Sequence, residues 1–127
     1  MAILEAISKI GSSYNHAMHS SANKNEPILV VGKMKISLAD EERREFLKLT
    51  NTLFERTETL DHPLTYSCSE SIQRSGEFVW NEVWVSKESL DNHLASSHFQ
   101  NWWKWVEPKL KEPLNVVYVE LAKTKKV

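Results

Sequence analysis

Residues 77–105 constrain the fold of this chain more than any other stretch, because they change abruptly from a strand pattern to a helix pattern. Residues 77–85 show the two-residue alternation of a strand, in which successive side chains point to opposite faces. From Ser86 onward, serines that can cap helices precede segments with helical spacing of apolar residues. All five tryptophans of the chain lie within this stretch. This concentration of aromatic surface predicts a core that surrounds a pocket.

The composition predicts one ordinary globular domain. The chain has 127 residues, of which 41% are hydrophobic and 26% are charged. Its formal net charge of −1 gives no reason to expect nucleic acid or an anionic membrane as a partner. The longest apolar run is far too short to span a bilayer. Cys68 is the one cysteine, so no intrachain disulfide is expected, and a reducing, cytoplasmic location fits.

Residues 1–26 are expected to form an extension outside the main fold, which we predict at residues 27–123. Apolar residues at positions 3, 4, 7 and 10 have the spacing of a short amphipathic helix. The segment lacks the basic start and continuous apolar core of a signal peptide. Docking of this helix on the body or on a partner chain, and a frayed tail, are both open alternatives. Residues 124–127 are expected to be a solvated basic tail.

The pattern in the main segment predicts four strands and two helical regions. The strands are expected at residues 28–36, 64–71, 77–85 and 114–122. One amphipathic helix is expected at residues 39–57, and a second helical region begins at residue 87 and splits at Ser96 or Ser97. This βαββαβ order predicts an α+β, ferredoxin-like fold, with a four-stranded antiparallel sheet and helices on one face.

Both faces of the predicted sheet carry apolar side chains. In the third strand, Trp80 and Trp84 share one face while Val79 and Val83 share the other. The helices can cover only one face, and an exposed apolar patch of this size is typical of an interface. We therefore expect a homodimer in which two copies pack sheet against sheet. The alternative is a monomer in which the N-terminal extension covers this face.

The run Glu82-x-Trp84-x-Ser86-x-Glu88-x-x-x-x-His93, followed by Ser96-Ser97-His98-Phe99, resembles the signature of the antibiotic biosynthesis monooxygenase family. The resemblance extends over about residues 28–122 and implies a dimeric α/β barrel built from ferredoxin-like subunits. That family includes cofactor-independent monooxygenases of quinols and polyketide anthrones, haem-degrading enzymes and members of unknown activity. The fold therefore does not decide the function.

Two segments depart from the family's pattern. Residues 60–64 stand where many members have a Glu-Pro-Gly-like turn, and they lack the glycine. The haem-degrading branch uses an asparagine on the first strand together with a tryptophan and a histidine. Residues 31–34 offer no asparagine, so haem degradation is disfavoured.

His93 and Glu82 are the candidate catalytic residues. An imidazole can act as a base near neutral pH, and cofactor-free oxygenation needs a base that leaves an electron-rich carbanion or enolate. The alternative for His93 is a structural hydrogen bond to a backbone carbonyl or a helix cap. Glu82 could orient His93 or bind a substrate hydroxyl, although a structural hydrogen bond is the favoured alternative for a buried acid.

A dry, aromatic-lined pocket would suit this chemistry. The residues predicted to bind the substrate are Trp84, Trp80, Tyr66, Phe99, Trp102 and His98. The favoured alternative for Trp84 is a structural position in the core. The favoured alternative for His98 is a position on the surface. Trp102, Trp103 and Trp105 are too close in sequence for all three to point inward.

No metal site and no cofactor are expected. The histidines at positions 16, 19, 62, 93 and 98 include no pair at i and i+4, and no glycine-rich phosphate loop or dinucleotide-binding motif is present.

With these residues, the resemblance implies an oxidoreductase, a cofactor-independent monooxygenase of a small aromatic, quinol or polyketide-like substrate, with dioxygen as the second substrate. The alternative is a non-catalytic dimeric module that binds a small hydrophobic ligand or takes part in stress signalling. Haem binding or degradation is the third hypothesis.

Overall fold

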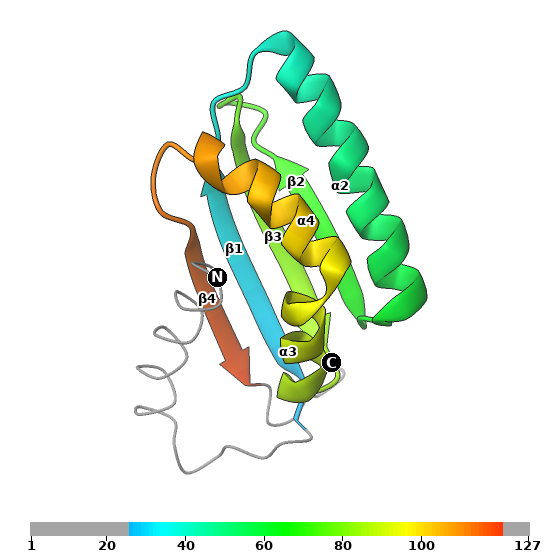
Figure 1. Ribbon diagram of the computed structural model, residues 1–127. Coiled ribbons are helices and arrows are strands. Elements are labelled where there is room, and N and C mark those ends of the chain that lie inside the picture. Colours follow the sequence, from blue (N-terminus) through cyan, green and yellow to red (C-terminus); the bar gives the residue numbers. More distant parts are fainter. Residues whose placement is uncertain (1–25, 121–127) are drawn as a thin grey trace.

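The computed structural model describes residues 26–120, which form one antiparallel sheet with helices packed on one side (Figure 1). The elements are β1 (Ile28–Lys35), α2 (Asp40–Leu60), β2 (Thr65–Glu70), β3 (Glu77–Trp84), α3 (Lys87–Ala95), α4 (Ser97–Val106), the 3₁₀ helix η2 (Glu107–Lys109) and β4 (Asn115–Glu120). The predicted α+β, ferredoxin-like fold is confirmed. The predicted N-terminal helix and basic tail fall on residues outside the described range.

The four strands lie in the order β2-β3-β1-β4, and every neighbouring pair is antiparallel. The central strand β1 pairs with β3 on one side and with β4 on the other. At its middle, Gly32 lies opposite Trp80 of β3 and Val116 of β4. This register places the side chains of Trp80 and Val116 on either side of a position that has no side chain.

Alternation along β3 sets the inner face of the sheet. Its four inward residues are all buried under the helices: Phe78, Trp80, Glu82 and Trp84. Of the residues between them, Val79 and Val83 are partly buried and Asn81 is exposed. Glu82 is therefore held among aromatic side chains by the two-residue period of the strand.

A hydrogen bond joins the two long helices. α2 buries one stripe of side chains at helical spacing, which includes Thr50 and Leu53, and α4 buries Trp102 and Trp103. Nε1 of Trp102 donates to Oγ1 of Thr50 at 3.0 Å. Trp105 remains half-buried with Nζ of Lys109 3.9 Å from its ring centroid. Of these three tryptophans one thus lies toward the surface, in line with the sequence argument.

The corner between α3 and α4 is fixed by Ser96. Its hydroxyl accepts a hydrogen bond from the backbone N–H of Phe99 and donates one to the carbonyl of His93. The chain therefore ends one helix and begins the next within two residues, as expected from the two serines. His93 in α3 and His98 in α4 are brought close together by this turn, with ring centroids 5.9 Å apart.

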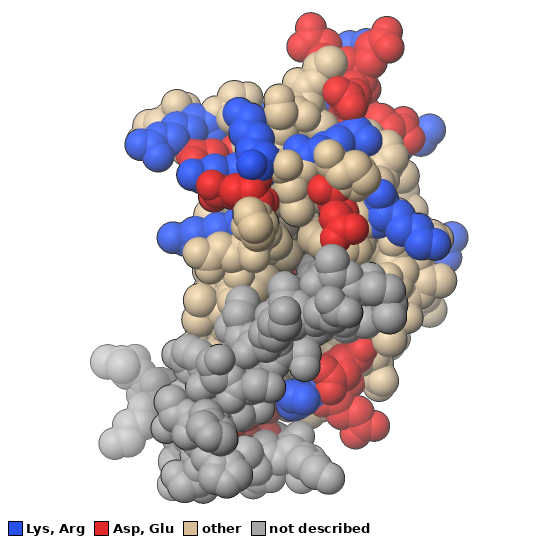
Figure 2. All heavy atoms as spheres, turned by 60° about the vertical axis from the view of Figure 1, so that its left-hand side comes forward, with Lys and Arg blue, Asp and Glu red and all other residues tan. Residues whose placement is uncertain are grey.

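The other face of the sheet has no described helix over it (Figure 1). Leu29, Val31 and Val83 are partly exposed there, and Val117 is 41% exposed. Figure 2 shows acidic and basic side chains interspersed over the upper part of its view, without a large block of one sign. Among the described residues, no helix has the length and apolar character to cross a membrane.

Candidate functional site

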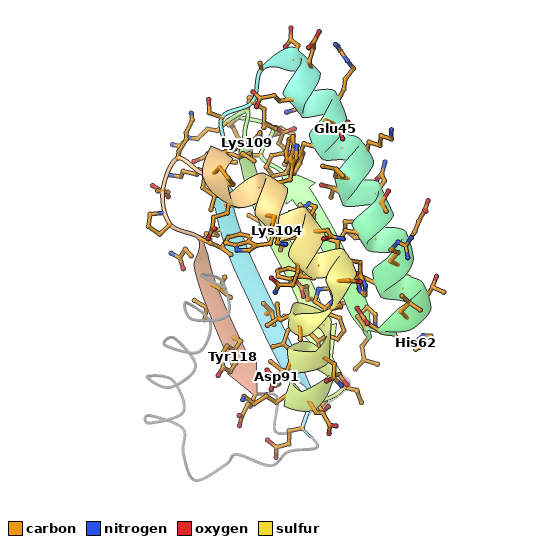
Figure 3. All side chains as sticks on the ribbon, viewed as in Figure 1. Glu45, His62, Asp91, Lys104, Lys109 and Tyr118 are labelled. Carbon is orange, nitrogen blue, oxygen red and sulfur yellow. The ribbon has the colours of Figure 1, made fainter. Side chains whose placement is uncertain are left out.

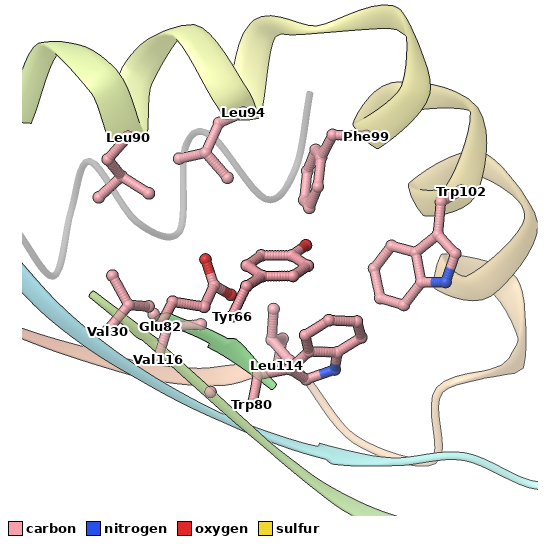
Figure 4. Close-up of a pocket in the computed structure, with 11 residues that line it drawn as sticks. Val30, Tyr66, Trp80, Glu82, Leu90, Leu94, Phe99, Trp102, Leu114 and Val116 are labelled. Carbon is pink, nitrogen blue, oxygen red and sulfur yellow. The ribbon is translucent and has the colours of Figure 1, made fainter. Parts of the chain in front are cut away.

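A small cavity lies between the inner face of the sheet and helices α3 and α4 (Figure 4). Its volume is about 40 Å³, which is room for one or two molecules the size of water. The residues that line it are Val30, Gly32, Tyr66, Trp80, Glu82, Leu90, Leu94, Phe99, Trp102, Leu114 and Val116. No lysine, arginine or histidine is among them. Its oxygen-bearing side chains are those of Glu82 and Tyr66.

The cavity owes part of its space to Gly32. A Cβ atom added there would lie 3.6 Å from Cβ of Trp80 and 3.9 Å from Cγ2 of Val116. These are ordinary van der Waals distances, so an alanine would fit without displacing a neighbour. Its methyl group would take up part of the cavity.

Among residues 26–120, Glu82 is the one carboxyl group that lines this cavity. Its side chain points into the space between the sheet and α3 (Figure 4), and the residue is only 9% exposed. Burial raises the pKa of Glu82 from its ordinary value of 4.5 to about 7, although the hydrogen bond from Nε1 of Trp84 at 2.9 Å favours the ionised form. Near neutral pH this carboxyl can both accept and release a proton.

Tyr66 begins a chain of hydrogen bonds that leads away from the cavity. Its hydroxyl lies 3.2 Å from Nε2 of His93, and Nδ1 of His93 lies 2.8 Å from Oδ2 of Asp61. A carboxylate only accepts, so Nδ1 of His93 carries the proton and donates it to Asp61. Nε2 then accepts from the Tyr66 hydroxyl, and the oxygen of Tyr66 has the hydroxyl of Thr57 as a second hydrogen-bond partner.

His98 completes this group from the other side of Asp61. Its Nε2 lies 2.6 Å from the same Oδ2 of Asp61 that His93 contacts. One carboxylate oxygen of Asp61 thus accepts hydrogen bonds from a histidine of α3 and a histidine of α4. Asp61 itself is the C-cap residue of α2. The group of Asp61, His93 and His98 is called the Asp61 cluster below.

Aromatic rings enclose His93 completely. The residue is 0% exposed, and its ring lies 4.6 Å from that of Trp84 and 5.2 Å from that of Phe99. Burial lowers the pKa of His93 from 6.5 to about 4, against the opposing effect of Asp61. The imidazole is therefore neutral near pH 7.

Burial also acts on Tyr66. Loss of hydration and the nearby charge of Glu82 together hold the pKa of its hydroxyl well above 10. Tyr66 is thus a hydrogen-bonding phenol near neutral pH.

The structure brings five of the eight predicted site residues to the cavity: Tyr66, Trp80, Glu82, Phe99 and Trp102. The other three, His93, Trp84 and His98, do not line it. Trp84 lies on the inner face of β3 but does not reach the cavity. Its ring packs against His93 and its Nε1 donates a hydrogen bond to Glu82, so it helps to hold both side chains in place. His98 is partly buried beside Asp61, with its side chain 7% exposed, instead of lying on the surface.

Sequence reasoning missed Asp61 and the aliphatic walls of the cavity. A carboxylate directly after the last turn of a helix opposes the helix dipole, and this is a signal that Asp61 has another partner. Leu90 and Leu94 are four residues apart on one face of α3, the spacing of a buried stripe. Once the inner face of the sheet is known, strand alternation predicts three further residues of the cavity wall, namely Val30, Leu114 and Val116.

The family model for antibiotic biosynthesis monooxygenase matches residues 27–105 of this chain. "Putative monooxygenase YcnE" of Bacillus subtilis is 27% identical over 94 residues, which cover 74% of this chain and 99% of that protein. "Uncharacterized protein sll1783" of Synechocystis is 25% identical over 100 residues, or 79% of this chain and 67% of that protein.

Solved structures show the same fold. The crystal structure of a "putative antibiotic biosynthesis monooxygenase" from Caulobacter crescentus CB15 has a TM-score of 0.72 at 19% identity, covering 84% of this chain and 99% of that chain. A "conserved protein" from Methanosarcina mazei Go1 has a TM-score of 0.66 at 23% identity, covering 76% of this chain and 94% of that one. At these identities the likeness is one of fold alone.

Proposed function

The chain belongs to the antibiotic biosynthesis monooxygenase family, and from that premise we propose that it is a cofactor-independent monooxygenase of a small hydroxylated aromatic compound. The observation that carries this proposal is the carboxyl group of Glu82. It lines a cavity with mostly apolar walls, its pKa is about 7, and the hydroxyl of Tyr66 lines the same cavity. A base of matched pKa in a water-poor site is what proton removal from carbon requires.

In the proposed reaction, the ionised carboxylate of Glu82 removes a proton from an activated CH₂ group of the substrate. The resulting carbanion is delocalised over the aromatic system and transfers an electron to dioxygen. Recombination forms a C–O bond as a peroxide, which loses water to leave a carbonyl group. The net change is CH₂ plus O₂ to C=O plus H₂O, so the substrate supplies all four electrons and no reductant is needed.

We assign Tyr66 the task of holding a substrate hydroxyl. Its own proton is directed to Nε2 of His93, so its oxygen would accept the hydrogen bond of a phenol or enol in the cavity beside, or in place of, that of Thr57. Asp61 fixes the tautomer of His93 that makes this direction possible. His93 and Asp61 are therefore positioning residues in this proposal. The single base that faces the substrate is Glu82.

The small volume of the cavity limits how the organic substrate and dioxygen can bind. A volume of about 40 Å³ accommodates dioxygen as the side chains stand, but an aromatic ring needs more room. Binding of the organic substrate therefore requires the lining side chains to separate, and dioxygen can occupy the space that remains. The absence of cationic side chains from the lining favours a neutral substrate over a carboxylate or phosphate.

The experiment measures oxygen uptake by the purified chain without added cofactor, first with anthrones, which carry the activated CH₂ group of the proposed reaction, and then with quinols and naphthoquinols, whose rings lack it. Glu82→Gln keeps the shape of the side chain but cannot accept a proton as a carboxylate does. The expected loss in kcat is at least about 100-fold, with KM little changed, because general base catalysis contributes about that much. The matched control is Glu88→Gln, an exposed carboxyl on α3, which is expected to keep full activity.

The pH profile separates the proposal from a structural role of Glu82. Uptake by the wild type is expected to rise with pH, with an apparent pKa near 7, as Glu82 ionises. Uptake that is the same for wild type and Glu82→Gln would remove Glu82 as the base.

A second candidate function is binding of a small hydrophobic ligand without chemistry. It is favoured by the position of His93, which is fully enclosed and does not line the cavity. Quenching of tryptophan fluorescence by a quinol, combined with no oxygen uptake across the panel, would support this reading over the monooxygenase.

A further inference from the structure

The Asp61 cluster lies on the far side of the His93 ring from the cavity. Nε2 of His93 meets Tyr66, whereas Nδ1 of the same ring meets Asp61 and, through it, His98. We propose that the Asp61 cluster binds one divalent transition-metal ion, with Asp61, His93 and His98 as its three protein ligands. This site is separate from the cavity and does not depend on the proposed oxygenation.

The donor atoms have the right chemistry. Two imidazole nitrogens and one carboxylate oxygen are the ligands that Zn²⁺, Fe²⁺ and Co²⁺ take in protein sites with open coordination positions. The set offers one donor atom from each residue, and all three atoms lie within 4.8 Å of one another. Each of the two histidines can give a neutral nitrogen once its proton moves to the other side of the ring.

The distances are close to those that a bound ion imposes. A metal about 2.1 Å from each ligand holds two ligand atoms about 3.0 Å apart at a right angle, or about 3.4 Å apart in a tetrahedron. Oδ2 of Asp61 is 2.8 Å from Nδ1 of His93 and 2.6 Å from Nε2 of His98. Both distances are shorter than that of a right-angle pair, so the carboxylate oxygen has to move away from both nitrogens to admit an ion.

The charge of the site favours a cation. In the forms that bind a metal, two neutral imidazoles and one carboxylate carry a charge of −1, which a divalent ion offsets. Among residues 26–120, the ion pairs of Asp61 are those with His93 and His98, so no lysine or arginine occupies the position of a metal.

The fold holds the three ligands on separate helical elements. Asp61 directly follows α2, His93 lies in the last turn of α3, and His98 is in the first turn of α4. The side chains of Asp61 and His98 are 13% and 7% exposed, against 1% for His93, so an incoming ion would reach the cluster from the side of Asp61 and His98. A bound ion would tie together the three helices that cover the sheet.

Metal binding would also reverse the hydrogen bond of Tyr66. With an ion on Nδ1, the remaining ring proton of His93 sits on Nε2 and is donated to the oxygen of Tyr66. The Tyr66 hydroxyl then has to donate its own proton to another acceptor, which is the hydroxyl of Thr57 or a ligand in the cavity. The ion would thus release the proton of Tyr66 from its bond with His93.

The test titrates the purified full-length chain, freed of metal with a chelator, with Co²⁺ and separately with Zn²⁺. The expected results are one Co²⁺ per chain with the visible absorption of nitrogen-ligated cobalt, and a melting temperature that rises with Zn²⁺. Asp61→Asn keeps the shape of the side chain without its charge, and His98→Gln removes one ligand. Each is expected to weaken Zn²⁺ binding at least about tenfold.

Two control variants test whether histidines outside the Asp61 cluster bind the metal ion. His62→Gln changes the exposed neighbour of Asp61 at the end of α2 (Figure 3), and His16→Gln with His19→Gln changes residues outside the described range. Both are expected to bind Zn²⁺ like the wild type. A folded wild type whose Co²⁺ spectrum stays that of the hydrated ion would overturn the proposal. Equal Zn²⁺ affinity of wild type and the correctly folded His98→Gln variant would overturn it as well.

Discussion

The hydroxyl of Tyr66 lies 3.2 Å from Nε2 of His93, and this contact separates His93 from the cavity that Tyr66 lines. Any proton that His93 exchanges with a ligand in the cavity has to pass through Tyr66. The sequence places both residues in the same fold but does not indicate which of them faces the ligand.

Tyr66→Phe tests the importance of this contact for the fold. The variant keeps the ring, but it leaves Nε2 of His93 buried without its partner. The free energy of unfolding is expected to fall by about 1–3 kcal/mol. Urea denaturation followed by tryptophan fluorescence measures the change. Ser67→Ala, at an exposed position of the same strand, is the control and is expected to stay within about 0.5 kcal/mol of the wild type.

Glu82 is expected to make the folded state less stable as the pH rises. Its pKa is raised from 4.5 to about 7 in the folded chain, so the folded state binds its proton more tightly than the unfolded state. The stabilisation is complete below about pH 4.5 and is lost as the pH rises through about 7, up to about 3 kcal/mol. Urea denaturation at about pH 5 and about pH 8 should show this loss in the wild type. Glu82→Gln should lack it, and an equal loss in both chains would contradict the assignment.

Gly32→Ala is expected to fill part of the cavity without disturbing the sheet. The added methyl group meets Trp80 and Val116 at ordinary contact distances, and alanine costs less conformational entropy in a strand than glycine. The melting temperature should therefore stay equal or rise, while affinity for a ring-sized ligand falls. Reduced affinity together with a lower melting temperature would mean that the strand had been distorted instead.

Thr50→Val tests the link between α2 and α4. The variant keeps the shape of the side chain and removes the acceptor of the bond from Nε1 of Trp102, so a loss of about 1–3 kcal/mol in unfolding free energy is expected. Thr52→Val is the matched control on the same helix, because its hydroxyl bonds the carbonyl of Lys48 at an exposed position. Equal losses in the two variants would show that the bond to Trp102 contributes little.

The uncovered face of the sheet is proposed to be the interface of a homodimer. Val117 is 41% exposed on this face and pairs with Val31 across the two strands. Light scattering after gel filtration should show a dimer for the wild type, and a monomer for Val117→Lys, because a lysine there would be buried without a partner. Ile72→Lys, at a 96% exposed position of the β2–β3 turn, should remain dimeric. A monomeric wild type would disprove the interface.

The local pattern determined much of the architecture. Alternation along β3 put Trp80, Glu82 and Trp84 on one face, and the serines at 86 and 96 marked the starts of two helices. Both features depend on residues near in sequence, so propensity and periodicity suffice to predict them. The same reasoning could not predict that Trp84 packs against His93 and does not line the cavity, because only tertiary packing decides which inward-facing residue reaches the cavity.

The tertiary structure alone decided the surroundings of His93. Asp61 contacts His93 and His98 across 32 and 37 residues of sequence, and no spacing rule connects the end of α2 with the corner between α3 and α4. The sequence determined that a histidine and a buried glutamate lie in an aromatic core. The packing of three helices on the sheet determined that Asp61 holds the histidine and Tyr66 covers it, while Glu82 faces the cavity. Burial in that packed arrangement, and not residue type, raises the pKa of Glu82 and lowers that of His93.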